Sequence, residues 1–266
     1  MMGARSADDE ISVRPRHALV RPPGRSFARA LTGQVPRPEI DVALAQAQHA
    51  AYVEALRTCG VEVTVLPPDE RFPDGCFVQD LAVLYEDVAV ICRPGAPSRR
   101  GEEAAVEEAL APHKRLVRIQ PPGTLEGGDV LRVGRRVFVG LSARTNQAGF
   151  AQLRDALEPL GATVLPIPVE GDLHLMTGCA YLGRGMLLAA GHRAGRPEFL
   201  GLDVIFVPPE EAYAANCLAI GGWAILPEGY PRVRAALEER GFRVLTVPMS
   251  EFRKADGGVT CLSLLW

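Results

Sequence analysis

Short runs of alternating or continuous apolar residues recur along the chain, and longer stretches with apolar residues every three or four positions lie between them. Residues 76–95 predict two strands joined by a turn. Residues 98–113 then have helical spacing, with Ser98 as the expected N-cap, and residues 114–122 predict a third strand. The local order is strand, strand, helix, strand.

This order recurs along the rest of the chain. Hairpins are predicted at 127–142, 174–191 and 215–229, helices at 144–161, 196–202 and 230–241, and third strands at 162–169, 203–209 and 242–249. A fifth unit starts at 257–266 and lacks its other elements, which residues 17–23, 38–60 and 61–68 can supply. The residues that open the units are separated by 49, 48, 39 and 45 positions and are Asp80, Asp129, Thr177, Asn216 and Cys261.

Repeated units that cannot bury their own apolar face stack against one another. We therefore predict an α/β fold of five ββαβ modules in a pseudo-fivefold ring, closed by pairing of the C-terminal strand with the N-terminal module. A plain mixed α/β sandwich with coincidental spacing is the alternative. Residues 17–266 are expected to form a single domain, preceded by a flexible tail at residues 1–16.

Composition and charge exclude several classes of protein. The net charge of −3 argues against bulk binding to nucleic acid or to an anionic membrane. No apolar run approaches the ~20 residues that span a bilayer, and the first residues lack the apolar core of a secretory signal. The six cysteines are widely spaced, without a Cys-x-x-Cys pair, which favours reduced thiols in the cytoplasm over disulfides or a zinc site.

A ring would bring chemically useful side chains to one end of its axis: Asp80, Glu126, Asp129, His174 and Cys261. A thiolate is a strong nucleophile, an imidazole transfers protons near neutral pH, and a carboxylate can orient the imidazole. Each residue also fits a structural role, such as a core histidine, turn carboxylates or a buried cysteine. The excess of carboxylates indicates a cationic electrophile, and a planar guanidinium fits.

Attack of the thiolate on the central carbon of a guanidinium would expel an amine and leave an amidino-thioester. Water, activated by His174 as base, would then release the carbon as a urea. The carboxylates would hold the cation in register with the sulfur.

Several long motifs in matching order carry a resemblance to a known family. They are LPPDERFPDGCFVQD, RPGAPSRRGE, LEGGDVLRVG, VGLSARTNQAG, LHLMTGCAYL, AYAANC and EFRKADGGVTCLSL. With them the chain resembles the dimethylarginine dimethylaminohydrolases, which belong to the guanidino-modifying superfamily with the pentein fold, and it is most similar to the bacterial members.

The resemblance implies a role for each motif residue. Cys261 would be the nucleophile, His174 the proton shuttle, and Glu126 the residue that orients the histidine. Asp80 would pair with the guanidinium, while Arg99 and Arg144 would hold the α-carboxylate of the substrate. Asp74 would lie near the α-amino group, Leu31 would belong to a lid, and the backbone at Ala255 would line the pocket.

Two positions depart from the family pattern. Gln79 stands where the motif Phe-Val-Glu-Asp has glutamate, and Met176 stands where bacterial relatives commonly have lysine. The glutamine removes one negative charge near the guanidinium, which would weaken binding of the cation or favour a differently substituted guanidine.

The sequence thus predicts hydrolysis of the C–N bond of asymmetric dimethylarginine or monomethylarginine to citrulline and an amine, without metal or organic cofactor. Phe77 is a candidate for the apolar wall that faces the methyl groups. Hydrolysis of free arginine by the same machinery is the first alternative, and a non-catalytic binding protein of the same fold is the second. The only partner expected is the small guanidino substrate, and the resemblance alone suggests a homodimer.

Overall fold

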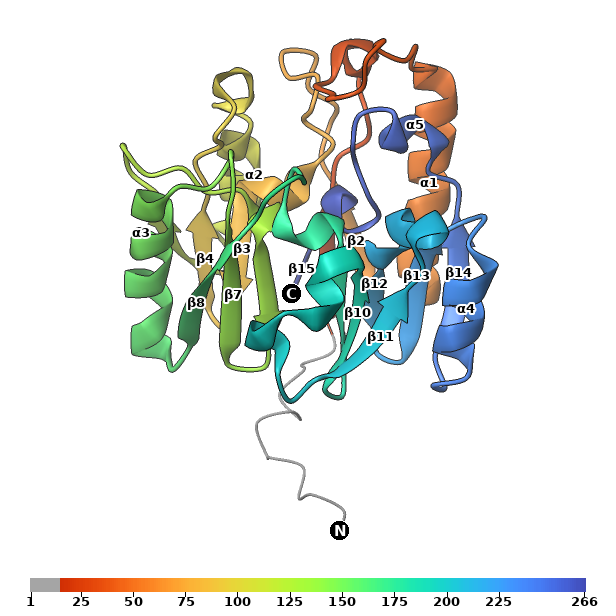
Figure 1. The fold of residues 1–266 in the computed structure, drawn as a ribbon. Coiled ribbons are helices and arrows are strands. Elements are labelled where there is room, and N and C mark those ends of the chain that lie inside the picture. The colour runs from red at the N-terminus through yellow and green to blue at the C-terminus, as the bar shows by residue number, and fades with distance from the viewer. Residues whose placement is uncertain (1–14) are drawn as a thin grey trace.

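Five three-stranded sheets are arranged around a central axis in residues 15–266, the part of the chain that the computed structural model describes (Figure 1). In each of them the middle strand is antiparallel to the first strand of the module and parallel to the last. Four sheets follow the predicted order along the chain and consist of β3 (Ala82–Tyr85), β4 (Val88–Ile91) and β5 (Arg115–Arg118); β6 (Val130–Val133), β7 (Arg136–Leu141) and β8 (Thr163–Pro168); β9 (Cys179–Gly183), β10 (Met186–Ala190) and β11 (Asp203–Val207); and β12 (Leu218–Ile220), β13 (Trp223–Pro227) and β14 (Arg243–Val247).

The fifth sheet joins the two ends of the described chain. It consists of β15 (Ser263–Leu265), β1 (His17–Val20) and β2 (Glu62–Val65). Strand β15 runs antiparallel to β1, with Leu265 opposite Ala18, so the predicted closure of the ring is confirmed. Residues 1–14 of the expected tail lie outside the described residues, whereas Arg16 already extends the sheet because its amide donates to the carbonyl of Trp266.

Helices connect the middle strand to the last strand and lie on the outside of the ring (Figure 1). They are α1 (Val42–Thr58), α2 (Glu103–Leu110), α3 (Gln147–Leu157) and α4 (Pro231–Glu238), and a short α5 (Ser250–Arg253) follows β14. In the third module the predicted helix is reduced to two 3-10 turns, η8 (Gly191–Gly195) and η9 (Pro197–Phe199). None of the helices in residues 15–266 is both long and apolar enough to cross a membrane.

The prediction of Ser98 as a helix N-cap is wrong. Ser98 lies in a separate 3-10 turn, η4 (Pro97–Arg99), and α2 begins after Glu102 without a side-chain cap. Gly101 separates the two elements because its φ of +105° lies outside the helical region, which glycine tolerates at little cost.

A short 3-10 turn precedes the first strand of every module. These turns are η3 (Val78–Leu81), η5 (Gly127–Asp129), η7 (Leu175–Thr177), η10 (Pro209–Ala215) and η11 (Thr260–Leu262). The first strands are neighbours around the axis, since β9 contacts both β6 and β12, and β15 contacts β3. The residues that open the repeats therefore all lie in or directly after these turns, at the same end of the ring.

Apolar side chains between neighbouring modules hold the ring together. The cluster around α1 contains the fully buried Tyr52 and Leu56 together with Phe252, and Cys261 packs against its edge. Burying one large apolar side chain contributes about 1.5 to 3 kcal/mol, so the last residues of the chain are fixed by packing as well as by strand pairing.

Candidate active site

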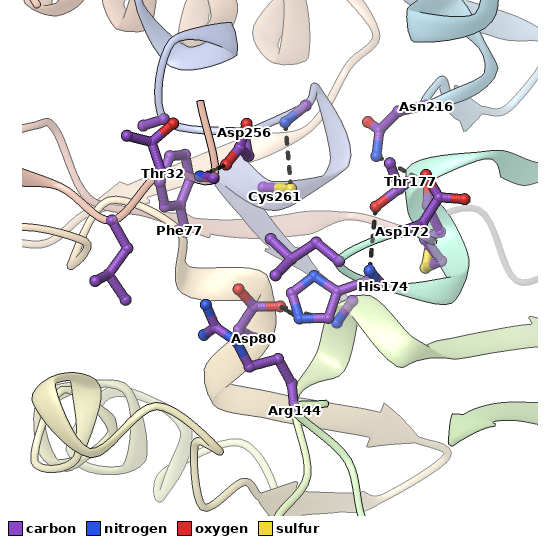
Figure 2. A pocket seen from close by; sticks show the side chains of 18 of the residues that line it. Thr32, Phe77, Asp80, Arg144, Asp172, His174, Thr177, Asn216, Asp256 and Cys261 are labelled. Carbon is purple, nitrogen blue, oxygen red and sulfur yellow. Dashed lines mark hydrogen bonds and ion pairs between the residues drawn. The ribbon is translucent and has the colours of Figure 1, made fainter. Parts of the chain in front are cut away.

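A cavity of about 620 Å³ opens at the end of the ring where the five turns meet (Figure 2). Four of the residues that open the repeats line it, namely Asp80, Thr177, Asn216 and Cys261. Asp129, which the repeat also placed at the centre, is not among the lining residues. Its carboxylate instead accepts hydrogen bonds from the amide of Leu175 at 2.9 Å and from the hydroxyl of Ser142 at 2.6 Å, and so supports the backbone beside His174.

His174 and Glu126 form a buried hydrogen-bonded pair. The imidazole Nε2 lies 2.7 Å from Glu126 Oε2, and Glu126 itself is fully buried behind the histidine. His174 lies at the N-terminus of η7, where its amide donates to Thr177 Oγ1. The predicted pairing of these two residues is therefore present in the structure.

The charges around this pair favour an imidazolium. Burial opposes protonation of His174, but the negative charges of Asp80, Asp129 and Glu126 and the hydrogen bond to Glu126 outweigh it and raise the pKa to about 9. Burial also opposes ionisation of Glu126, yet the hydrogen bond from His174 and the nearby arginines hold the pKa of this carboxyl below its usual value. At neutral pH the pair is expected to carry one positive and one negative charge.

Gly127 and Gly128 of the LEGGD motif are required by close approach. A Cβ on Gly128 would lie 2.7 Å from His174 Nδ1 and 2.9 Å from Asp80 Oδ1. A Cβ on Gly127 would lie 1.9 Å from the carbonyl oxygen of Gln79. The Gly128 amide donates to Asp80 Oδ1 at 2.9 Å, so this backbone touches both functional side chains.

Cys261 lies across the cavity from His174 and Asp80 (Figure 2). The amide of Gly258 donates to its sulfur at 3.3 Å. Burial and the negative charge of Asp80 raise the pKa of the thiol to about 12, so a protonated thiol is expected at neutral pH when no further cation lies beside it. Cys261 is half-buried, whereas the other five cysteines are buried, and this contrast singles it out for reaction.

Arg99 binds Asp80 and is itself bound by Glu102. The Arg99 guanidinium donates to Asp80 Oδ2 at 2.6 Å, to Glu102 Oε2 at 2.9 and 3.1 Å, and to the carbonyl of Phe77 at 3.1 Å. We expected Arg99 to hold a substrate carboxylate; the structure gives it these protein partners, and contact with substrate stays a prediction. Glu102 was missed from the sequence, although its spacing of three residues from Arg99 could have indicated an ion pair.

The remaining predicted residues surround the other parts of the cavity. Arg144 lies 3.3 Å from Glu126 Oε1, and Asp74 accepts a hydrogen bond from the amide of Leu31 at 2.9 Å. Burial raises the pKa of Asp74, against the opposing charges of the arginines. Phe77 packs edge-on against Phe252. Of the predicted site residues, these line the cavity: Leu31, Asp74, Phe77, Gln79, Asp80, Arg99, Arg144, His174, Ala255 and Cys261.

Comparisons with known proteins show the family to which the chain belongs. The family model described as N,N dimethylarginine dimethylhydrolase, eukaryotic, matches residues 33–174. A dimethylarginine dimethylaminohydrolase of Pseudomonas aeruginosa is 46% identical over 253 residues, which cover 94% of this chain and 98% of the relative. The Streptomyces coelicolor protein of the same name is 41% identical over 251 residues, with coverages of 94% and 96%. The chain belongs to the dimethylarginine dimethylaminohydrolase family.

Solved structures of the family share this fold over the whole ring. A cysteine-to-serine variant of the Pseudomonas aeruginosa enzyme in complex with citrulline has a TM-score of 0.93 and 44% identity, and the match covers 96% of this chain and 100% of that one. The N-terminal domain of a cyanobacterial arginine dihydrolase has a TM-score of 0.85 at 21% identity, covering 94% of this chain and 96% of that one. The latter shows the fold alone, and together the two confirm the pentein architecture.

Gln79 and Met176, the two residues that we expected to depart from the family motif, are in contact. Gln79 Nε2 donates to the sulfur of Met176 at 3.5 Å, and Gln79 Oε1 accepts from Thr260 Oγ1 at 3.1 Å. Gln79 and Met176 also line a second cavity of about 460 Å³, whose walls are the first strands of the modules. Gln79 and Met176, called the floor pair below, thus lie between the active-site cavity and this second cavity.

Asp80, Glu126 and His174 could also hold a metal ion, because their ligand atoms all lie within 4.8 Å of one another. The Arg99 guanidinium already neutralises Asp80, with Nη1 4.0 Å from Glu126, and the imidazole is bound to Glu126. That this protein works without a metal ion therefore stays a prediction.

Proposed function

We propose that this chain hydrolyses Nω-methylated arginine to citrulline and methylamine or dimethylamine through a covalent adduct on Cys261. The observation that carries the proposal is the placement of one accessible thiol opposite a buried imidazole–carboxylate pair, with Asp80 beside both. A binding protein without chemistry would need no such set, although the fold alone would not exclude one.

Binding of the substrate would start the reaction. A guanidinium seated against Asp80 adds a positive charge beside the Cys261 sulfur, which lowers the pKa of the thiol from its high resting value. The Gly258 amide already donates to the sulfur and would stabilise the thiolate. The thiol proton would then be released to solvent, since His174 already carries one, and the nucleophile is formed only when the cation is in place.

Two half-reactions follow from the protonation states. The thiolate bonds to the guanidinium carbon, and the His174 imidazolium gives its proton to the methylated nitrogen, which departs as the neutral amine. Neutral His174 then removes a proton from water as the water oxygen bonds to the same carbon. The carbon–sulfur bond breaks, the hydroxyl proton of the adduct passes to the departing sulfur and restores the thiol, and the carbon leaves as the ureido group of citrulline.

The opposite charges of Asp74 and Arg144 support an amino-acid substrate. Both line the cavity, and they would bind the α-ammonium and the α-carboxylate respectively. A solved family structure contains citrulline, and another is an adduct of a histidine-to-glycine variant with S-methyl-L-thiocitrulline. Both ligands are amino acids that carry an α-ammonium and an α-carboxylate, as the proposal requires.

The experiment is a comparison of substrates with the parent protein and Cys261→Ser. We expect the parent to release citrulline from asymmetric dimethylarginine with a kcat/KM at least tenfold above that for free arginine, and the variant to release none. Mass spectrometry of the quenched parent reaction should find an adduct on Cys261. Cys217→Ala, which changes a buried cysteine, serves as control. Citrulline formation by Cys261→Ser would refute the mechanism, and the reverse substrate preference would assign free arginine.

We also propose that the protein is cytoplasmic and forms a homodimer. The widely spaced cysteines support a reducing compartment, and the net charge of −3 speaks against nucleic acid as a partner. The homodimer rests on the resemblance to the family. Light scattering of the purified protein would test it.

A further inference from the structure

Residues 31–34, called the mouth segment below, border the entrance to the active-site cavity. All four line the cavity, and they contain no helix or strand. They range from half-buried to exposed, so little apolar packing holds them in place. Figure 2 shows Thr32 of this segment beside Asp256 of the loop that leads to Cys261.

Polar contacts fasten the mouth segment on two sides. On one side the amide of Leu31 donates to Asp74 Oδ1 at 2.9 Å. On the other side the amide of Gly33 donates to Asp256 Oδ2 at 2.6 Å. The side-chain amide of Gln34 donates to Asp256 Oδ1 at 3.3 Å and to the carbonyl of Arg253 at 2.8 Å. Asp256 therefore uses both carboxylate oxygens on the mouth segment.

The backbone conformation of Asp256 indicates that its side chain makes necessary contacts. Its φ is +56°, in the left-handed region where glycine is favoured and where other residues cost roughly 1 kcal/mol, aspartate somewhat less. The chain has glycine at the next two positions and an aspartate at this one. Retaining a side chain at such a position is explained when the side chain makes contacts that glycine could not.

The loop that follows Asp256 is also the support of the nucleophile. The carbonyl of Gly257 accepts a hydrogen bond from Tyr213 Oη at 2.7 Å, and the amide of Gly258 donates to the Cys261 sulfur at 3.3 Å. One rigid loop thus connects the mouth segment to the reacting sulfur. A change at Asp256 would release the mouth segment without removing a group that touches the guanidinium carbon.

We propose that Asp256 is a positioning residue for the reaction, which fastens the mouth segment to the loop of Cys261 and so holds the substrate in the closed cavity. This inference rests on the proposed function. Asp74 holds the mouth segment through the amide of Leu31 and would also bind the α-ammonium of a substrate. The contact of the mouth segment with Asp74 therefore depends on the ligand. The contact of the mouth segment with Asp256 is made by the protein alone.

The test uses Asp256→Gly, Asp256→Asn and the control Asp155→Asn, which changes an exposed aspartate on α3. Glycine keeps the left-handed backbone and removes the carboxylate, whereas asparagine tolerates the same backbone and keeps one acceptor. In Asp256→Gly we expect hydrogen exchange of the Gly33 amide to be at least tenfold faster, with exchange at Leu264 in β15 unchanged. KM for dimethylarginine should rise at least fivefold, and kcat should change less than threefold.

Asp256→Asn should lie between the parent and Asp256→Gly, and Asp155→Asn should match the parent. Unchanged exchange at Gly33 in both Asp256 variants would overturn the proposal, and so would a fall in kcat at constant KM. If Asp256→Gly fails to fold, the exchange and KM of Asp256→Asn decide. Amide exchange needs no turnover, so this test can fail or succeed independently of the assignment of Cys261 as nucleophile.

Discussion

Glycines in the wall of the active-site cavity allow backbone and side chains to approach more closely than other residues would. A Cβ on Gly257 would lie 2.4 Å from the Phe77 ring, and one on Gly258 would lie 2.4 Å from the Asn216 side chain. Neither these two nor Gly128 has a left-handed φ. The glycine pair before Cys261 therefore serves close packing.

Gly128→Ala should abolish most of the activity while the fold persists. The added methyl would push on His174 and Asp80, and displacing a proton donor or a charge partner by a fraction of an ångström costs on the order of a hundredfold in rate. Steady-state kinetics and thermal unfolding measure the two effects. Gly195→Ala is the matched control, since a Cβ there meets nothing within 4 Å. A Gly128→Ala protein with the parental kcat would contradict the geometry described here.

His174 should make the stability of the protein depend on pH. Its pKa is raised to about 9 in the folded state, above the usual value of 6.5, so the folded protein keeps a proton that the unfolded chain releases between these pH values. The stabilisation is complete below pH 6.5 and is lost as the pH rises through 9, with a total on the order of 3 kcal/mol. Urea unfolding of the parent and of His174→Gln at pH 6 and pH 9.5 measures it. Equal pH dependence in the two proteins would show that His174 is not the group responsible.

At the scale of elements, the 3-10 turn before each first strand is the feature that builds the site. Because every module has such a turn at the same end, polar residues from all five are brought together although they are 39 to 49 positions apart. The β-hairpins instead supply apolar side chains to the buried clusters of the ring. Chemistry and packing are thus assigned to different parts of the same repeated element.

The floor pair of Gln79 and Met176 joins η3 to η7, and its members should be energetically coupled. Gln79→Glu would bring a carboxylate against the thioether, and Met176→Lys would bring an ammonium against the amide, so each should lower the unfolding free energy by about 1 to 2 kcal/mol. The double variant restores opposite charges and should recover at least half of the loss. Denaturant unfolding of the four proteins gives the coupling energy. Additive effects would show that the two side chains act independently.

At the scale of the molecule, closure of the ring fixes the end of the chain on which Cys261 lies. Trp266 stacks against His17 with a centroid distance of 5.5 Å and against His113 at 5.6 Å, and its backbone exchanges hydrogen bonds with His17. A residue near a chain terminus can therefore be held firmly enough to act as a nucleophile, in spite of the usual fraying of chain ends.

Trp266→Ala should lower the unfolding free energy by about 1 to 2 kcal/mol through the lost ring contacts and leave kcat within a few-fold. Deletion of residues 264–266 removes most of β15 and should abolish activity. Calorimetry and kinetics of both variants measure these effects. An active deletion variant would show that Cys261 is positioned by η11 and the apolar cluster alone.

The order of elements, the five modules and the closure of the ring could be predicted because each depends on local apolar patterns that recur along the chain. The failure of Ser98 to cap a helix could not be predicted, because the single Gly101 separates η4 from α2. The loss of the third-module helix could not be predicted either, because residues 191–202 form a short linker of 3-10 turns. The pairing of Arg99 with Asp80 depends on how η4 folds back onto η3 within one module. The contact of Gln79 with Met176, 97 positions away, depends on how two modules pack. No local pattern encodes either contact.

Because β1 and β15 are neighbouring strands, the first and the last strand of the described residues could be joined directly. A short linker from Trp266 to Arg16 would make the backbone circular, and a new start could be cut at the exposed hairpin turn of Gly221 and Gly222. Such a circular permutant would keep all five modules and carry its reactive thiol in the interior of the chain.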